Sequence, residues 1–376
     1  MKVQVLQEKL KKGLSIMERV SSKSLTLPIL NNTLISTEKN FLNLSATDLE
    51  IGINWWTLTK TEKEGKVAVP SRLLLSFVNL LPNKKIDVAV KENDLSVQCE
   101  SYKTKIKGFS ADEFPLIPKV GKEEFVVVKS SDFCKSLSQV ADIAMPSTTR
   151  PEISGVYFRL QKDLIIAAAT DSFRLGEKKI SLKEEKLINK DYSLIIPQKT
   201  VKEIINIFGE KEGDLKVYFS PNQIMFEYFM EEVSHPEVQV VSRLIEGEYP
   251  NYQEIIPQKF ATQITIEKEA FVNQIKSAAL FSGKVNEIKL KVDSEKKETI
   301  VSSQSVDIGD YQSTVSGKVK GGDTEVSFNH KFLLDGLMNI KSSEVVFDLN
   351  GESGPGVLRP VGDDSYLYVV MPIKAS

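Results

Sequence analysis

An internal repeat constrains the fold of this chain more than any other feature. A segment of alternating apolar and polar residues, followed by an apolar pattern with helical spacing, occurs three times. Each copy predicts a strand leading into a helix with one apolar stripe, because residues at i, i+4 and i+7 lie on one helix face. The copies read MKVQVLQEKLKKGLSIMERV, EEFVVVKSSDFCKSLSQVADIAM and ATQITIEKEAFVNQIKSAALF. Their stripe residues are Leu10, Leu14 and Met17, then Phe133, Leu137 and Val140, then Phe271, Ile275 and Ala278.

Two further sets of three segments repeat with similar spacing. The first set predicts strand, turn and helix, and it reads KVAVPSRLLLSFVNLL, SLIIPQKTVKEIINIF and EVSFNHKFLLDGLMNI. It places Ser71, Gln198 and Asn329 at equivalent positions, 127 and then 131 residues apart. The second set joins an aromatic residue, a proline and a strand, and it reads ADEFPLIP, GEYPNYQEIIP and YVVMPI.

The repeats predict an α+β fold of three similar domains, at 1–121, 122–257 and 258–376. Each domain contains two helices, and one apolar face per helix beside alternating strands predicts helices packed on antiparallel sheets. Equal repeats that contact one another head to tail tend to close into rings. We therefore expect a ring, with three domains joined like beads on a string as the alternative.

The composition is that of an ordinary globular protein, with 41% hydrophobic and 27% charged residues. The two cysteines, Cys99 and Cys134, have no CxxC partner and are typical of small core residues in a reducing compartment. No apolar stretch approaches the ~20 residues of a membrane helix, and the N-terminus does not resemble a signal peptide. We expect a cytoplasmic protein that is not associated with a membrane.

Basic residues lie on the polar faces of the predicted helices and in the loops beside them. A net charge of −2 argues against a protein that coats nucleic acid with its whole surface, yet a local basic stripe remains compatible with it. A solvated helix face is the alternative for any single helix. Scattered lysines without a base-reading helix favour weak, sequence-independent phosphate contacts. The candidate DNA-binding residues are Lys12, Lys23, Arg72, Arg150, Lys199 and Lys202.

No arrangement of residues in the sequence predicts catalysis. His235 and His330 have no partner at metal-ligand spacing, and nucleotide-binding glycine motifs and a GxSxG motif are missing. Asp48 and Asp171 are equivalent positions of two repeats, which indicates a shared structural role. We expect no enzyme, no cofactor and no metal. A hydrolase with a site between domains, or a peptide-binding scaffold that never encircles DNA, are the alternatives.

Six segments distributed over the whole chain carry a family resemblance: SLTLPILNNTLIS, LSATDLEIGI, FSADEFPLIP, AAATDSFRLG, GEYPNYQEIIP and YVVMPI. Their sequences, order and spacing resemble the bacterial sliding clamp, the beta subunit of DNA polymerase III holoenzyme. The resemblance implies a non-catalytic processivity factor, in which two three-domain subunits form a homodimeric ring around duplex DNA. It implies as partners the polymerase III alpha subunit, clamp-loader subunits, and other polymerases and repair proteins that bind through short linear peptides.

In that family the partner peptides bind in a groove between the second and third domains. The resemblance implies that the strand-forming end of the chain, Tyr366 to Met371, borders this groove. A core strand is the alternative. Ser172 stands where relatives commonly have glycine, Phe173 where many have histidine, and Glu254 at an often basic position, so the peptide preference is expected to differ. The implied groove residues are Ile153, Thr170, Ser172, Phe173, Arg174, Leu175, Pro250, Val285, Asn329, Phe332, Pro355, Val369, Val370, Met371, Pro372 and Ile373.

The resemblance also bears on the DNA contacts and on the subunit interface. Lys23, Arg72, Arg150 and Lys199 lie at or beside positions that face DNA in relatives, although Pro151 and Glu152 replace an aromatic pair found in some of them. The interface joins the first domain of one subunit to the third domain of the other. Its expected apolar members are Ile106 and Leu280, with an ordinary core role as the alternative for each.

Overall fold

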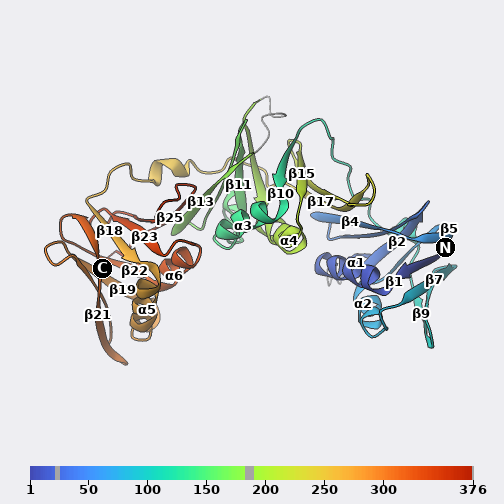
Figure 1. Ribbon diagram of the computed structural model, residues 1–376, viewed down its shortest axis with the longest axis horizontal. Helices are drawn as coiled ribbons and strands as arrows, with labels where there is room; N and C mark the ends of the chain where they lie inside the picture. The colour runs from blue at the N-terminus through green and yellow to red at the C-terminus, as the bar shows by residue number, and fades with distance from the viewer. Residues whose placement is uncertain (22–25, 183–189, 375–376) are drawn as a thin grey trace. The chain divides into compact units, whose positions relative to one another are not determined.

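The computed structural model describes residues 1–21, 26–182 and 190–374 (Figure 1). The chain separates into two compact units. Unit 1 comprises Met1–Cys134, Leu182–Lys190 and Lys199–Ile245, and unit 2 comprises Lys135–Ser181, Asp191–Gln198 and Glu246–Ser376. The residues between about 122 and 257 are thus shared between the two units. The boundaries at 121 and 257 stay predictions.

Unit 1 contains two sheets. The five-stranded sheet has the order β5 (Lys60–Lys63), β1 (Lys2–Leu6), β7 (Lys85–Lys91), β8 (Asp94–Cys99) and β9 (Tyr102–Lys107). The eight-stranded sheet has the order β10 (Phe125–Lys129), β15 (Asp214–Phe219), β16 (Gln223–Phe229), β17 (Pro236–Arg243), β4 (Ile51–Leu58), β3 (Phe41–Thr47), β2 (Asn32–Glu38) and β6 (Gly65–Pro70). The pairing of β17 with β4 joins segments almost 190 residues apart in the sequence.

Unit 2 contains one twelve-stranded sheet. Its first half has the order β14 (Tyr192–Pro197), β11 (Gly155–Leu160), β12 (Leu164–Thr170), β13 (Arg174–Ser181), β25 (Tyr366–Val370) and β24 (Gly356–Pro360). The order continues with β23 (Glu344–Leu349), β18 (Thr262–Glu267), β21 (Gly309–Gly321), β20 (Glu298–Ser305), β19 (Glu287–Asp293) and β22 (Thr324–Asn329). The strand pairings that the described residues form are antiparallel in both units, as predicted.

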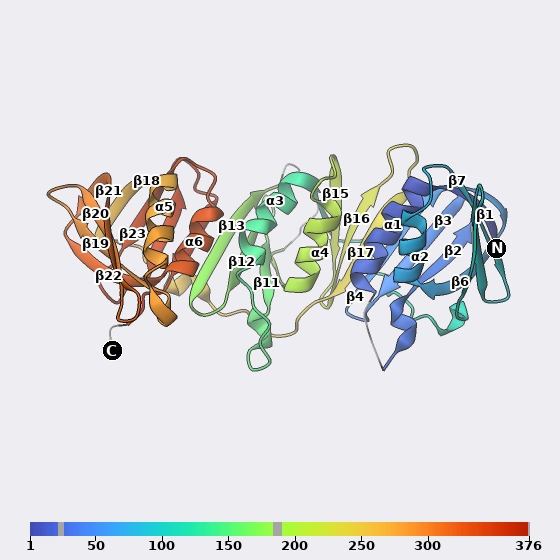
Figure 2. The same cartoon turned by 90° about the horizontal axis from the view of Figure 1, so that it is seen from below.

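Six α-helices occur among the described residues, two for each predicted domain: α1 (Gln7–Val20), α2 (Ser71–Asn79), α3 (Ser130–Ala141), α4 (Gln198–Phe208), α5 (Lys268–Ala279) and α6 (His330–Met338). In unit 1, α1 and α2 lie side by side and contact the sheet that contains β2 (Figure 2). In unit 2, α5 lies beside α6 and packs on β18 to β21. Helices packed on antiparallel sheets are therefore confirmed.

The helical stripes predicted from the repeat form the core. All nine stripe residues of α1, α3 and α5 are buried. Burying one large apolar side chain contributes about 1.5–3 kcal/mol, so each stripe is a major part of the free energy of folding. In α1, Gly13 permits a close approach to Trp55 of β4, because an added Cβ would collide with the indole ring. No helix of the described residues is long and apolar enough to span a membrane.

The last strand of the chain is a core strand of unit 2. β25 pairs with β13 on one side and β24 on the other, and it buries Tyr366, Tyr368, Val369 and Val370. The strand ends at Val370, one residue earlier than the expected Met371. The alternative that this segment is a core strand is therefore correct for Tyr366–Val370. The residues after it are more accessible, and Met371 is 37% exposed.

Candidate functional site

The loop between β12 and β13, residues 170–174, is held by its own polar groups. The Thr170 hydroxyl donates to the carbonyl of Arg174 over 2.7 Å and accepts from the amide of Ser172 over 3.1 Å. Oδ1 of Asp171 accepts from the amides of Phe173 and Arg174, each over 3.0 Å. Threonine and aspartate favour such turns because their short side chains reach nearby backbone groups. We call residues 170–174 the second loop. Local hydrogen bonds fix its conformation.

Ser172 adopts a conformation that favours glycine. Its φ is 76°, in the left-handed region, where a residue with a Cβ is strained by about 1–2 kcal/mol. Its hydroxyl accepts a hydrogen bond from Nη1 of Arg150 over 3.3 Å. The expectation that relatives commonly have glycine here has a physical reason, since glycine adopts this φ without strain.

Phe173 points its ring outward, next to another aromatic ring. It is 60% exposed, and its ring centroid lies 6.3 Å from that of Phe332 on α6, with an angle of 23° between the ring planes. The main chain holds Phe173 in place, because its carbonyl accepts from the amide of Met371 over 2.8 Å. The structure thus brings together Phe173, Phe332 and Met371, all predicted site residues.

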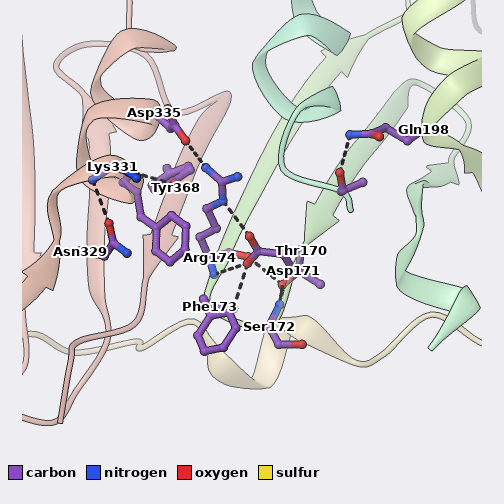
Figure 3. A network of polar contacts seen from close by, with 12 residues as sticks. Thr170, Asp171, Ser172, Phe173, Arg174, Gln198, Asn329, Lys331, Asp335 and Tyr368 are labelled. Carbon is purple, nitrogen blue, oxygen red and sulfur yellow. Dashed lines mark hydrogen bonds and ion pairs between the residues drawn. The ribbon is translucent and has the colours of Figure 1, made fainter. Parts of the chain in front are cut away.

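Arg174 connects the second loop to α6. Its Nε donates to Oδ2 of Asp171 over 2.9 Å, and Nη1 donates to Asp335 (Figure 3). Its guanidinium carbon lies 4.8 Å from the centre of the Phe332 ring. Burial acts to lower the pKa of Arg174, but Tyr368 and Asp171 raise it overall. The guanidinium is therefore charged and engaged on several sides. Tyr368 also donates to the carbonyl of Phe332 over 2.8 Å, which fixes the first turn of α6.

An apolar cluster lies beneath the loop. It contains the predicted residues Leu175 and Val369, which are cross-strand partners, together with Tyr252 of the short 3-10 helix Tyr252–Ile255. The Tyr252 hydroxyl donates to Oε2 of Glu177 over 2.6 Å, and burial together with this carboxylate raises its pKa. The cluster is a rigid support. Leu175 and Val369 are 1% exposed, so direct contact with a partner requires the more accessible residues around them.

The remaining predicted groove residues lie on several elements of unit 2. Ile153 and Thr170 are buried, as is Val370, which pairs with Arg174. Asn329 caps α6 by accepting from the amide of Lys331 over 3.0 Å. The amide of Ile373 donates to Ser327 of β22 over 2.8 Å, which directs the end of the chain toward that strand. Pro250, Pro355 and Pro372 are half-buried, and Val285 is 64% exposed.

Sequence reasoning missed Asp335 and Tyr368. Asp335 lies 161 residues after Arg174, and an aspartate on a helix surface gives no signal of a partner at that distance. Tyr368 belongs to the terminal segment, where its alternating position indicates burial but not the hydrogen bond to Phe332. Both residues depend on the pairing of β13 with β25, which only the folded sheet creates.

Unit 1 contains a copy of the second loop between β3 and β4. In this first loop, residues 47–51, Thr47 donates to the carbonyl of Ile51 and accepts from the amide of Leu49, while Oδ1 of Asp48 accepts from the amides of Glu50 and Ile51. The φ of Leu49 is 78°. The contact with the neighbouring strand also repeats. The amide of Arg243 donates to the carbonyl of Glu50 over 3.0 Å, as the amide of Met371 donates to the carbonyl of Phe173. Asp48 and Asp171, each in an Ala-Thr-Asp sequence, therefore share a structural role in the two loops, as their equivalent positions predicted.

Two of the predicted DNA-binding residues of unit 1 form ion pairs with acidic side chains. Lys12 contacts Glu237 over 2.9 Å, and Lys199 contacts Asp48. Arg72 is exposed at the start of α2, Lys202 is exposed on α4, and Lys23 lies outside the described residues. The Lys12 and Lys199 side chains are 52% and 51% exposed and therefore accessible to a phosphate, whereas the side chains of Glu237 and Asp48 are only 18% and 8% exposed. In unit 2, Arg150 contacts Glu152 and Ser172, which places it beside the second loop.

The two predicted interface residues differ in exposure. Ile106 lies on the edge strand β9 and is 4% exposed, so within the described residues it fills a core position. Leu280 follows α5 and is 72% exposed. Only Leu280 offers apolar surface to a second subunit without rearrangement.

The two cysteine side chains are inaccessible to solvent. Both cysteines are buried, and burial raises the pKa of Cys134 to about 12, which keeps the thiol protonated. No group of three or more histidine, cysteine, aspartate or glutamate side chains in the described ranges is placed to hold a metal ion.

Comparison with known proteins gives consistent matches along the chain. Residues 1–118, 127–251 and 253–374 match the models of the N-terminal, central and C-terminal domains of the DNA polymerase III beta subunit. The beta sliding clamp of Staphylococcus aureus strain Mu50 is 29% identical over 362 residues, covering 93% of both chains. That of Staphylococcus epidermidis is 28% identical over 361 residues, again covering 93% of both chains.

Solved structures show the same fold. The DNA polymerase sliding clamp from Bacillus subtilis superposes with a TM-score of 0.93 at 23% identity, and the beta subunit from Thermotoga maritima with 0.91 at 24%. A sliding clamp from Pseudomonas aeruginosa bound to griselimycin gives 0.92 at 22%. Each comparison covers 100% of both chains. With three consecutive domain models spanning nearly its whole length, this chain belongs to the DNA polymerase III beta subunit family of sliding clamps.

Proposed function

We propose that this protein is a DNA sliding clamp, a non-catalytic processivity factor that keeps a replicative polymerase on duplex DNA. The observation that carries the proposal is the match of the whole chain, domain by domain, to the polymerase III beta subunit. The same assignment accounts for the threefold repeat, because head-to-tail contact between equal units favours a closed ring. The domain boundaries at 121 and 257, and a cytoplasmic, nucleoid-associated location, belong to this proposal.

The mechanism that we propose is topological. Two subunits close around duplex DNA, and Leu280 contributes apolar contact area where they meet. Basic residues such as Lys12, Lys199 and Lys202 face the phosphates, where weak and salt-sensitive contacts permit sliding without reading sequence. Enclosure of the DNA then keeps the clamp bound for longer than these weak contacts alone would. A separate loader opens the ring, and the clamp itself needs no cofactor.

Partner proteins dock on the surface around the second loop. These partners are the polymerase III alpha subunit, clamp-loader subunits, other polymerases and repair proteins, each through a short extended peptide. The exposed apolar residues Phe173 and Met371, which a main-chain hydrogen bond joins, support this assignment, and methionine adapts its shape to varied side chains. Exposed apolar residues gathered on one surface are typical of binding sites.

The copy of the loop in unit 1 explains why only the second loop is proposed as a docking site. Gly52 occupies the position equivalent to Leu175, since the two residues pair with Val241 and Val369 at the same step of their strands. A Cβ at Gly52 would lie 2.7 Å from Cγ2 of Ile117, so the interdomain segment already fills that space. The first loop therefore has the same backbone conformation as the second loop but lacks the apolar cluster beneath it.

The topological mechanism is tested on circular and linear DNA. The clamp, placed by a loader on a nicked plasmid, is expected to stay bound through gel filtration at moderate salt. Cutting the plasmid once should release it, because a ring slides off a free end. Gel filtration before and after the cut measures retention. Equal loss from circular and linear DNA contradicts enclosure, and a nicked circle incubated with clamp but no loader is the control for contact-only binding.

A further inference from the structure

Three ion pairs on the helices of unit 1 combine an exposed cation with a carboxylate that is largely buried. They are Arg19–Glu203, Lys12–Glu237 and Lys199–Asp48. In the first pair, Nε of Arg19 donates to Oε2 of Glu203 over 2.6 Å, and the two side chains are 41% and 13% exposed. The three cations belong to α1 and α4, which lie on one side of the eight-stranded sheet (Figures 1 and 2). In each pair, the cation is thus the member that a ligand can reach.

Two other ion pairs of unit 1 are exposed at both ends. Lys2 contacts Glu62 over 2.7 Å, and Lys84 contacts Glu100. All four side chains are about half-exposed or more, so both charges of each pair remain hydrated. A carboxylate that is largely buried cannot regain its hydration unless the structure opens. The carboxylates on the helices therefore stay with their cations.

Each carboxylate cancels part of the charge that its cation presents. Two opposite charges in contact act at a distance as a dipole, whose field falls off faster than that of a single charge. Glu237 is shared, because Nζ of Lys211 contacts it over 2.6 Å in addition to Lys12. Burial acts to raise the pKa of Glu237, but the two lysines lower it overall, so this carboxylate is ionised. The four cations and three carboxylates together leave a net charge of only +1.

The paired cations can still contact a phosphate. A lysine ammonium has three N–H donors and an arginine guanidinium has five, so a contact with one carboxylate leaves donors unused. About half of the Lys12 side chain and half of the Lys199 side chain remain exposed for this purpose. The arrangement therefore permits short-range contact with a phosphate while it reduces the attraction at longer range. Weak contacts of this kind allow a protein to slide along DNA.

We propose that Asp48, Glu203 and Glu237 limit the attraction between the clamp and DNA phosphates, and thereby keep the resistance to sliding low. The inference rests on the sliding function proposed above. It goes further by assigning a role to three carboxylates and by adding Arg19 to the residues that contact DNA. The alternative is a purely structural role, because each pair joins the predicted first domain to the predicted second domain.

The first measurement is the affinity of the full-length protein for a linear duplex in the absence of a loader. Asp48→Asn, Glu203→Gln and Glu237→Gln each remove one negative charge and keep the size of the side chain. Each variant should bind a duplex of ~20 base pairs more tightly than the parent and steepen the plot of log K against log salt concentration by up to about 0.9. The gain in affinity should then be about three- to fourfold larger at ~50 mM than at ~200 mM salt. Fluorescence anisotropy measures both quantities.

Matched variants separate this role from a structural one. Glu62→Gln removes the same charge from an exposed pair on β5 and should leave the affinity near that of the parent. Lys199→Gln should weaken DNA binding, whereas Asp48→Asn should strengthen it. A purely structural role predicts instead that both variants lower the melting temperature and change the DNA affinity in the same direction. If Asp48→Asn does not fold, Arg19→Gln and Glu203→Gln carry the same comparison.

The second measurement is movement on DNA. A loader places the parent, or the variant with all three carboxamides, on a long circular DNA, and single-molecule tracking gives the diffusion coefficient. The triple variant should diffuse at least about twofold more slowly, because stronger phosphate contacts slow each step, and both proteins should stay bound. Carboxamide variants that bind no more tightly than Glu62→Gln, or that diffuse as fast as the parent, overturn this inference alone. A parent protein that is not retained on the circle overturns the proposed sliding function itself.

Discussion

At the scale of single residues, the site combines predictable and unpredictable positions. The repeated ATD motif predicts a turn, because aspartate begins turns, and both loops have that turn. The ion pair between Arg174 and Asp335 could not be predicted, since neither residue carries a pattern that refers to the other. The role of Ile106 could not be predicted for a different reason. Its alternating strand position fits a core and an interface equally well, and only the folded sheet shows that it is buried.

Replacing Ser172 by glycine should stabilise the protein. The φ of 76° strains any residue with a Cβ, and relief of that strain exceeds the extra freedom of glycine in the unfolded chain. We expect Ser172→Gly to raise the free energy of unfolding by about 0.5–1 kcal/mol, and Ser172→Val to lower it by more than that. Urea denaturation measures both. Leu49→Gly, at the same φ in the first loop, is the matched control, and a glycine variant less stable than the parent would contradict the argument.

At the scale of elements, hydrophobic periodicity predicted which helix faces are buried. The pairing of distant strands, in contrast, determined how the sheets are assembled. The three apolar stripes were correct at all nine positions, because a helix with one apolar face must bury it. The terminal strand was predicted correctly in type but ends one residue earlier. The pairing of β4 with β17 and of β13 with β25 joins distant segments, and no local pattern in the sequence specifies such partners.

Truncation after Val370 tests the terminal segment. β25 remains complete in this variant, so the sheet of unit 2 keeps its pairing with β13 and β24. We expect loss of polymerase stimulation in a primer-extension assay, with a melting temperature within a few degrees of the parent. Met371→Ala in the full-length chain should weaken stimulation partially. Full stimulation by the truncated protein would show that Met371 and the residues after it do not contact the partner.

At the scale of the whole molecule, the threefold repeat predicted the fold class from sequence because one pattern was seen three times. The structure adds a division that the repeat does not contain, since the residues of the central repeat are shared between two compact units. Long strand pairings hold each unit together, and a domain boundary defined by sequence similarity need not be the boundary of the most compact units.

The assembly of two subunits depends on Leu280 in our proposal. A charged side chain at this exposed position should leave the fold intact and prevent apolar contact between subunits. We expect Leu280→Asp to sediment as a monomer of about the 42.1 kDa chain mass, whereas the parent sediments as a dimer. Leu116→Asp, at a residue that is 95% exposed, is the matched control and should remain dimeric. A dimeric Leu280→Asp protein would place the interface elsewhere.

The central place of β25 has a consequence for how the protein is made. β25 is the last strand in chain order, yet it sits between β13 and β24 inside the sheet of unit 2. During synthesis, β13 remains unpaired on the side of β25 until the ribosome has translated almost two hundred more residues. Phe173 also depends on the segment after β25, because the amide of Met371 donates to its carbonyl. A chain that is interrupted anywhere between β13 and β25 would leave one edge of β13 without its partner strand and Phe173 without this hydrogen bond.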